Sequence, residues 1–257
     1  RFERREQPVI VPPTVFHSQQ SANLPTAQTI SRGAWLFEIS HRFFPAVSEG
    51  FQALWGLDGP VANRLGLAYA VSDRTMVGVV RTNIDDNLEL NAKARLFEGG
   101  TESVPVMIGI MGGFAWNMSD PGESGAGDNE SQAYAQVMLN ALIGGRLGIG
   151  LVPTVLRNPR IQDAEPGTTF ALGIHGQAYI SEQVSLLGEW IISKRQPDLE
   201  HDSGTLGVEL ETGGHFFKIV LTNQYRMNPT QVVGGTPSQF KPKYWRLGFN
   251  VTRLLTF

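Results

Sequence analysis

The sequence predicts an all-β fold, a closed antiparallel up-and-down transmembrane β-barrel of about twelve strands. Three observations support this prediction. Apolar and polar residues alternate over most of the chain, short and long connections take turns between the alternating segments, and the last segment is an apolar strand that ends in an aromatic residue. A soluble β-sandwich or a large lipocalin-like barrel is the alternative interpretation of the alternation taken by itself.

Alternation is the pattern of strands whose two faces meet different surroundings. It is clearest around Leu90, where Leu or Ala fills every second position while Glu89 and Lys93 fall between them. Residues 75–83 are ambiguous, because both of their faces are apolar. The pattern places strands at residues 34–43, 63–71, 75–83, 87–97, 104–116, 131–143, 146–156, 168–180, 184–193, 203–212, 215–225 and 243–257.

The connections between these strands alternate in length. Short turns are expected at residues 72–74, 98–103, 144–145, 181–183 and 212–214, and longer polar loops at 44–62, 117–130, 157–167, 194–202 and 226–242, with the short connection 84–87 as the exception. In an up-and-down barrel the short turns then share one end, as the periplasmic turns of outer-membrane barrels do. The even strand count places both termini at that end. We therefore expect a bacterial outer-membrane protein whose N- and C-termini are periplasmic.

Composition excludes several other classes of protein. No run of residues approaches the roughly 18 consecutive apolar residues of a membrane-spanning helix. Cysteine is absent, which excludes disulfides and thiolate metal sites. A net charge of -3 gives no reason to expect nucleic acid as a partner. We expect no cofactor and no metal site, since no two histidines have metal-ligand spacing. Because the chain begins at Arg1 rather than Met, we interpret it as a mature form without its signal peptide.

The C-terminal strand carries a candidate assembly signal. Trp245, Phe249 and Phe257 share one of its faces. This arrangement resembles the β-signal of bacterial outer-membrane proteins, an alternating apolar strand with a terminal aromatic residue. The expected partners are therefore outer-membrane lipid and the barrel-assembly machinery.

Four segments carry a resemblance to a known family: residues 39–43 (ISHRF), 51–59, 63–69 (NRLGLAY) and 76–81 (MVGVVR). They resemble an uncharacterised bacterial β-barrel family, a domain of unknown function found mainly in Bacteroidetes-like Gram-negative bacteria. The resemblance is strongest over residues 34–97, and beyond them only the strand rhythm is shared. It implies an outer-membrane barrel and supplies no activity, ligand or catalytic residue.

If the apolar faces meet lipid, the opposite faces line the lumen. The side chains expected there are Glu38, Arg42, Arg64, Glu89, Lys93, Arg95, Arg146, His175, Glu189, Glu209, Glu211, Lys218 and Arg246. They form either a buried ion-pair network that narrows or closes a small barrel, or the lining of a narrow channel that selects small polar solutes.

Two segments bear on whether the lumen is open. Loop 44–62 has apolar residues at near-helical spacing, and Phe51, Leu54 and Trp55 predict a short mouth helix that folds inward; a position on the membrane surface or against a partner protein is the alternative. Residues 1–33 lack periodicity, so we expect an extended periplasmic segment before a barrel at 34–257. Alternatively, the segment threads into the lumen as a plug or docks a periplasmic protein.

The predicted function is a narrow porin-like channel for small polar solutes. The rival is a non-conducting structural or scaffold subunit of a larger outer-membrane assembly, with other outer-membrane or periplasmic proteins as partners. An ordered N-terminal segment and a blocked lumen would favour the rival. No enzymatic activity is expected, because Ser40 and His41 are neighbours on one strand and face opposite sides.

Overall fold

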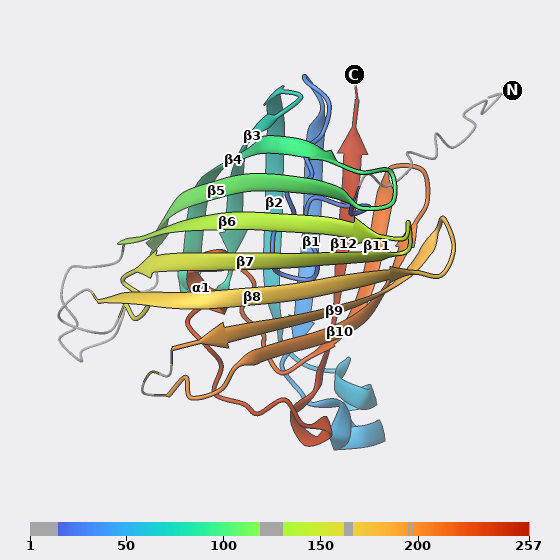
Figure 1. The fold of residues 1–257 in the computed structure, drawn as a ribbon. Helices are drawn as coiled ribbons and strands as arrows, with labels where there is room; N and C mark the ends of the chain where they lie inside the picture. The colour runs from blue at the N-terminus through green and yellow to red at the C-terminus, as the bar shows by residue number, and fades with distance from the viewer. Residues whose placement is uncertain (1–14, 119–130, 162–166, 195, 197, 257) are drawn as a thin grey trace, which may run out of the picture.

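The computed structural model describes residues 15–118, 131–161, 167–194, 196 and 198–256. They form a closed barrel of twelve antiparallel strands, in which β1 closes the wall by pairing with β12 (Figure 1). The strands are β1 (Trp35–Phe43), β2 (Val61–Ser72), β3 (Thr75–Thr82), β4 (Asn87–Gly100), β5 (Pro105–Asn117), β6 (Ser131–Ile143), β7 (Leu147–Arg157), β8 (Thr168–Tyr179), β9 (Val184–Ser193), β10 (Ser203–Glu211), β11 (His215–Thr222) and β12 (Arg246–Leu255). The predicted fold class is confirmed, and the predicted strand bounds differ from these by at most three residues.

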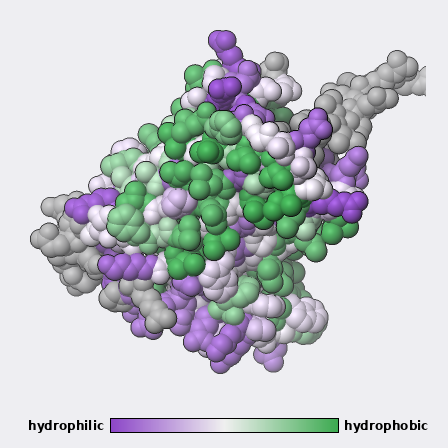
Figure 2. Space-filling model, in the orientation of Figure 1, coloured by the Kyte–Doolittle hydropathy of each residue, from purple (hydrophilic) through white to green (hydrophobic). Residues whose placement is uncertain are grey.

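The two faces of the wall differ as the alternation predicts. In β10, Leu206, Val208 and Leu210 are exposed, whereas Thr205 and Glu209 are buried. The space-filling view shows apolar side chains gathered over the strands (Figure 2). The outer surface is therefore built to contact lipid, and the polar face is enclosed.

Strand β3 resolves the ambiguity of residues 75–83. Val77 and Val79 are exposed on the outer face, while Met76 and Val80 are buried inside the barrel. Met76 packs in an apolar cluster that also contains Ile30. The inner face of β3 is apolar because it packs against the apolar side chain of Ile30 inside the barrel.

Short turns close one end of the barrel, which we call the turn end. Gly144 and Gly145 have φ values of 57° and 66°, the left-handed conformation that two-residue hairpin turns require and that glycine adopts at little cost. The opposite loop end carries η1 (Val47–Gly56), η2 (Ile84–Asp86), α1 (Pro229–Val232) and η3 (Pro242–Tyr244). Within the described residues, no helix is long and apolar enough to span a bilayer.

The N-terminal segment lies inside the barrel. Val15, Phe16, Leu24 and Ala27 are at most 1% exposed. The expectation of an extended periplasmic segment is therefore wrong for residues 15–30, because the wall supplies this segment with hydrogen-bond partners and apolar contacts. The part of that expectation that concerns residues 1–14 lies outside the described residues.

The predicted mouth helix does not fold inward. Phe51, Leu54 and Trp55 are 74%, 44% and 53% exposed. The element η1 is a kinked 3-10 segment in which Leu54 and Trp55 have positive φ. Another loop already fills the mouth: residues 223, 224 and 227–236, which follow β11, are buried. The expectation that Phe51, Leu54 and Trp55 constrict the lumen is therefore wrong.

Candidate functional site: the plugged lumen

Residues 15–30, which we call the plug, fold back on themselves within the lumen. A bridge between Gln20 and Pro25 reverses the chain. Both arms lead back to the turn end. Near the start of the plug, the carbonyl of Val15 accepts a hydrogen bond of 3.0 Å from the end of β8, and near its end the Thr29 hydroxyl donates to the β2–β3 turn at 2.7 Å.

The reversal is held by one carboxylate of the wall. The backbone N–H groups of Ala22, Asn23 and Leu24 donate to Oε2 of Glu189 at 3.2, 2.9 and 2.9 Å, and the Asn23 side chain donates to Oε1 at 2.8 Å. Glu189 belongs to β9 and is buried. Hydrogen bonds to an ionised acceptor are stronger than neutral ones, so this carboxylate is a main anchor of the plug.

On β11, Lys218 holds the other side of the plug. Its ammonium group donates to Ser18 Oγ at 2.6 Å and to the carbonyl of Ser21 at 2.8 Å, and it also reaches the carbonyl of Gln20. The same group forms an ion pair with Glu209 at 3.1 Å. All three donor positions of the ammonium group are therefore used within the lumen.

Two further cations bind the plug from other strands. Arg42 of β1 donates to Asn23 Oδ1 at 3.1 Å and to Asn250 Oδ1 of β12 at 2.7 Å. Lys93 of β4 donates to the carbonyls of Gln19 and Thr26 at 3.1 and 3.3 Å. The wall therefore holds the plug with charges from at least four separate strands.

Glycines on the inner face make room for the apolar residues of the plug. A Cβ atom at Gly173 would lie 2.6 Å from Leu24 Cδ1, and one at Gly148 would lie 3.0 Å from Phe16 Cε1. Phe16 and Leu24 pack in a buried cluster with inward-facing residues of β5 to β9. One side of the lumen is therefore apolar and matched to the plug.

Residues 223–236, which we call the cap, enter the lumen from the loop end. Asn228 donates to Asn87 Oδ1 at 2.6 Å, and Val232 and Val233 join the apolar cluster that receives the plug. Gln231 donates to the carbonyl of Ile84 at 2.9 Å. The cap is held chiefly by neutral amides and aliphatic contacts.

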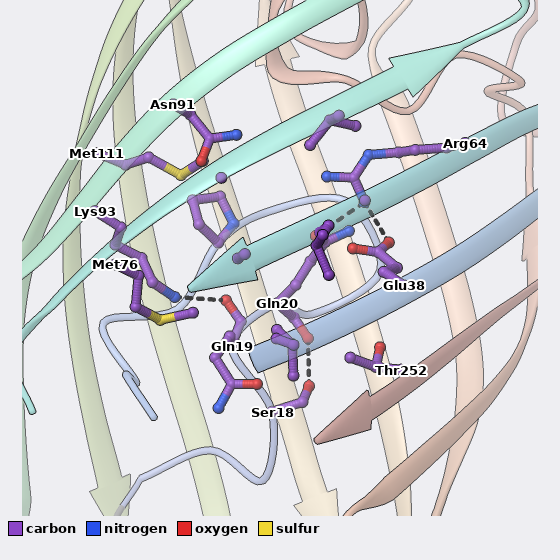
Figure 3. A pocket seen from close by; sticks show the side chains of 17 residues that line it. Ser18, Gln19, Gln20, Glu38, Arg64, Met76, Asn91, Lys93, Met111 and Thr252 are labelled. Atoms are coloured by element: carbon purple, nitrogen blue, oxygen red, sulfur yellow. Dashed lines mark hydrogen bonds and ion pairs between the residues drawn. The ribbon is translucent and has the colours of Figure 1, made fainter. Parts of the chain in front are cut away.

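Arg64 joins the two inserted segments. It forms an ion pair with Glu38, donates to Gln20 of the plug at 3.4 Å and donates to Asn228 of the cap at 3.0 Å. Figure 3 shows Arg64, Glu38 and Gln20 meeting beside a cavity of about 80 Å³ between the plug and the wall. That space holds a few water molecules and is too small for a sugar-sized solute.

The other residues predicted to line the lumen lie in its interior, at its two ends or outside it. Glu89, His175 and Glu211 are buried, and the Phe16 ring lies against His175 with centroids 4.7 Å apart. Arg95 pairs with Glu98 at 3.2 Å near the turn end. At the loop end, half-buried Arg246 donates to the carbonyl of residue 44 at 2.9 Å. Arg146 is exposed in the β6–β7 turn and does not line the lumen.

The predicted nucleophile–base separation is visible on β1. Ser40 is buried and donates to Glu38 at 2.6 Å, whereas the His41 ring lies 4.5 Å from that of Phe249. Among the described residues, no group of three or more His, Asp or Glu side chains is placed to hold a metal ion. Trp245 and Phe249 are half-buried, and Phe257 of the candidate assembly signal lies outside the described residues.

Sequence reasoning missed the apolar anchors of the plug and the whole cap. The inward-facing charges of the wall gave one indication that the lumen is occupied. Glu189 faces His175 and Thr205 on the neighbouring strands, and Lys93 faces Met76 and Met111, so neither has an opposite charge across the ladder. Such buried charges need a partner from within the lumen.

The sequence matches the family described as "Membrane bound beta barrel domain (DUF5777)" over residues 16–255. The chain belongs to this family. The match begins within the plug, so the family pattern covers both the inserted segment and the wall. The resemblance stated from the sequence is thereby confirmed as that of a membrane-bound β-barrel family. No curated protein matches the chain.

Solved structures of outer-membrane barrels share the fold. The COG4313 outer membrane channel from Pseudomonas putida F1 has a TM-score of 0.57 at 14% identity, covering 89% of this chain and 98% of that one. The NanC porin has a TM-score of 0.51 at 6% identity, covering 86% and 99%, and the KdgM porin has 0.50 at 7%, covering 87% and 99%. The chain is therefore a membrane-bound β-barrel that shares the fold of these outer-membrane channels and porins.

Proposed function

We propose that this chain is a gated channel for small polar solutes, and that the plug closes it from the turn end. One observation carries the proposal: the wall binds the plug through charged groups that water can also solvate. If the plug withdraws, Arg42, Lys93, Glu189 and Lys218 would line a hydrated polar passage. A plug that only filled the barrel would need no charged lining. Apolar packing would stabilise a closed interior without burying charges that require partners.

The arrangement of the plug supports withdrawal as a unit. Both of its arms lead to the turn end, and the wall closes through β1 and β12 without a strand from the plug. The cap, in contrast, is fixed between β11 and β12. We propose that the turn end is periplasmic, that both termini therefore lie in the periplasm, and that the barrel-assembly machinery inserts the chain through its last strand.

A reversible lock tests gating directly. A Cβ atom at Gly109 would lie 3.3 Å from Ala27 Cβ, close to the separation found in disulfides. Since the chain has no cysteine, the double variant Ala27→Cys/Gly109→Cys ties the plug to β5 and to nothing else. The matched control is Ala68→Cys/Gly78→Cys, whose Cβ atoms would lie 3.4 Å apart and which joins two strands of the wall.

The readout is single-channel conductance in a planar bilayer. We expect brief openings from the native chain, none from the oxidised plug lock, recovery on reduction, and no redox effect in the control. A variant lacking residues 1–30 should stay open, and shortening the cap in that variant should enlarge its conductance. Silence of both shortened variants, with folding verified by circular dichroism, would defeat the proposal.

The second candidate is a non-conducting structural subunit of an outer-membrane assembly. The filled lumen supports it, because an ordered N-terminal segment and a blocked passage are the features expected of such a subunit. Its test is co-purification of the full-length chain from outer membranes. Stable periplasmic or outer-membrane partners, together with silent bilayers, would favour this candidate over the channel. Neither candidate involves catalysis.

A further inference from the structure

A second cavity, of about 430 Å³, lies at the loop end. We call it the mouth pocket. The cap contributes Tyr225, Arg226 and Thr230 to its lining, β6 contributes Gln132, and the β7–β8 loop contributes Arg160. Its volume lies within the range typical of small-molecule sites. None of the plug residues lines it, so it is separate from the plug.

Arg226 is one of the two arginines that line this pocket. In the described part of the chain it forms no ion pair, and its Nε atom is buried without a hydrogen bond. Its guanidinium carbon lies 5.8 Å from the centre of the Tyr225 ring. The lumen cation Lys218, by contrast, forms an ion pair with Glu209 and donates to oxygen atoms of the plug.

The acidic groups of the pocket are engaged elsewhere. Asp85 accepts a hydrogen bond from the Gln231 amide at 3.3 Å. Asp198 lies 3.9 Å from Arg160, and its side chain is 92% exposed. Neither carboxylate forms an ion pair with Arg226, so its guanidinium group is left to bind an anionic group in the pocket.

A hydroxyl group and apolar walls complete the site. Thr230 is fully buried, and its Oγ1 atom has no hydrogen-bond partner. A buried hydroxyl without a partner is costly, and a polar group in the pocket would supply the hydrogen bond that Thr230 lacks. Pro159, Leu199 and Pro237 add apolar surface around it, which suits a carbon skeleton better than a bare inorganic ion.

We propose that the mouth pocket binds a small hydroxylated organic anion, with its carboxylate on Arg226 and a hydroxyl on Thr230. The role of this site in transport rests on the proposed function, because the bound anion would be the class of solute that enters the barrel at its loop end. Binding itself requires neither an open lumen nor movement of the plug.

Isothermal titration of the full-length chain in detergent provides the test. The probe is glucuronate. Glucose is the control that keeps the ring and hydroxyls without the carboxylate, and acetate keeps the carboxylate without the hydroxyls. We expect glucuronate to bind more tightly than either. Arg226→Gln should weaken glucuronate by about tenfold or more, as loss of a charge-assisted contact does.

Two further variants make the result specific. Thr230→Val, which keeps the shape of the side chain, should weaken glucuronate severalfold and leave acetate unchanged. Arg81→Gln is the matched control, because Arg81 is an exposed arginine of the loop end that pairs with Asp86 at 2.9 Å, and it should bind like the native chain.

Equal affinity for glucose and glucuronate, an unchanged affinity in Arg226→Gln, or no binding of any of the three probes would overturn the inference. The titration makes no use of conductance. A failure of binding therefore leaves the plug-lock experiment standing, and silence in the bilayer leaves the titration standing.

Discussion

The plug and the cap fill one lumen from opposite ends, and the wall holds them by different chemistry. The wall binds the plug through four ionised side chains, those of Glu189, Lys218, Arg42 and Lys93. The cap is held by amides such as Asn228 and by aliphatic contacts. Both segments also make apolar contacts, Phe16 and Leu24 from the plug and Val232 and Val233 from the cap. The charged contacts, which water can replace when a segment leaves, are what distinguishes the plug. The difference suggests that the plug is the moving part and the cap the fixed one.

Removing the central cation of the plug site should have the largest effect. Lys218→Met deletes the donors to Ser18 and Ser21 and removes the lysine charge from buried Glu209, which keeps its contacts with His17 and Gln177. Breaking a buried pair in this way costs about 3–5 kcal/mol. We expect the plug amides to lose most of their protection in hydrogen exchange, while the strands of the wall keep theirs. Unchanged protection of residues 15–30 would contradict the contrast between plug and cap.

The control for that variant is Lys243→Met. Lys243 is an exposed lysine of η3 at the loop end, and it has no contact with the plug. Its substitution should change neither the exchange of the plug nor the unfolding of the barrel.

The wall of this barrel could be predicted from the sequence because the information is local. Alternation fixes which side chains face inward, as Glu209 and Lys218 show, and turn glycines such as Gly144 fix where strands reverse. The plug could not be predicted in the same way. Its carboxylate anchor Glu189 lies 165 to 167 residues from the amides that it binds, and no periodicity connects such distant positions.

The composition of the plug also misled the sequence reading. A polar, proline-containing segment without periodicity is typical of an extended tail. Here its Ser, Asn and Gln groups instead match buried charges of the wall, and Phe16 and Leu24 fit above Gly148 and Gly173. Inward glycines, and inward charges without a partner across the ladder, are the signals that pointed to an occupied lumen.

Crowding the apolar side of the plug should have an intermediate effect. At Gly173 a new side chain would meet Leu24, so Gly173→Val should destabilise the seated plug by about 1–3 kcal/mol through overpacking. Hydrogen exchange at residues 22–27 reports the change. Gly176→Val on the same strand is the matched control, because a Cβ atom there would meet its nearest neighbour, the carbonyl oxygen of Gly148, at 3.6 Å. Equal effects of the two variants would show that β8, rather than the plug, responds to the substitution.

The smallest effect is expected in the cap. Asn228→Ala removes the hydrogen bonds to Asn87 and Arg64, and a neutral hydrogen bond contributes about 1 kcal/mol. Arg64 keeps its ion pair with Glu38, and β11 and β12 hold both ends of the cap in place. We therefore expect a modest rise in exchange within residues 227–233 and none in the plug. Gln52→Ala, in the exposed η1 segment, should change neither region. Loosening of the plug by Asn228→Ala would instead mean that Arg64 couples the two segments, and that the cap takes part in gating.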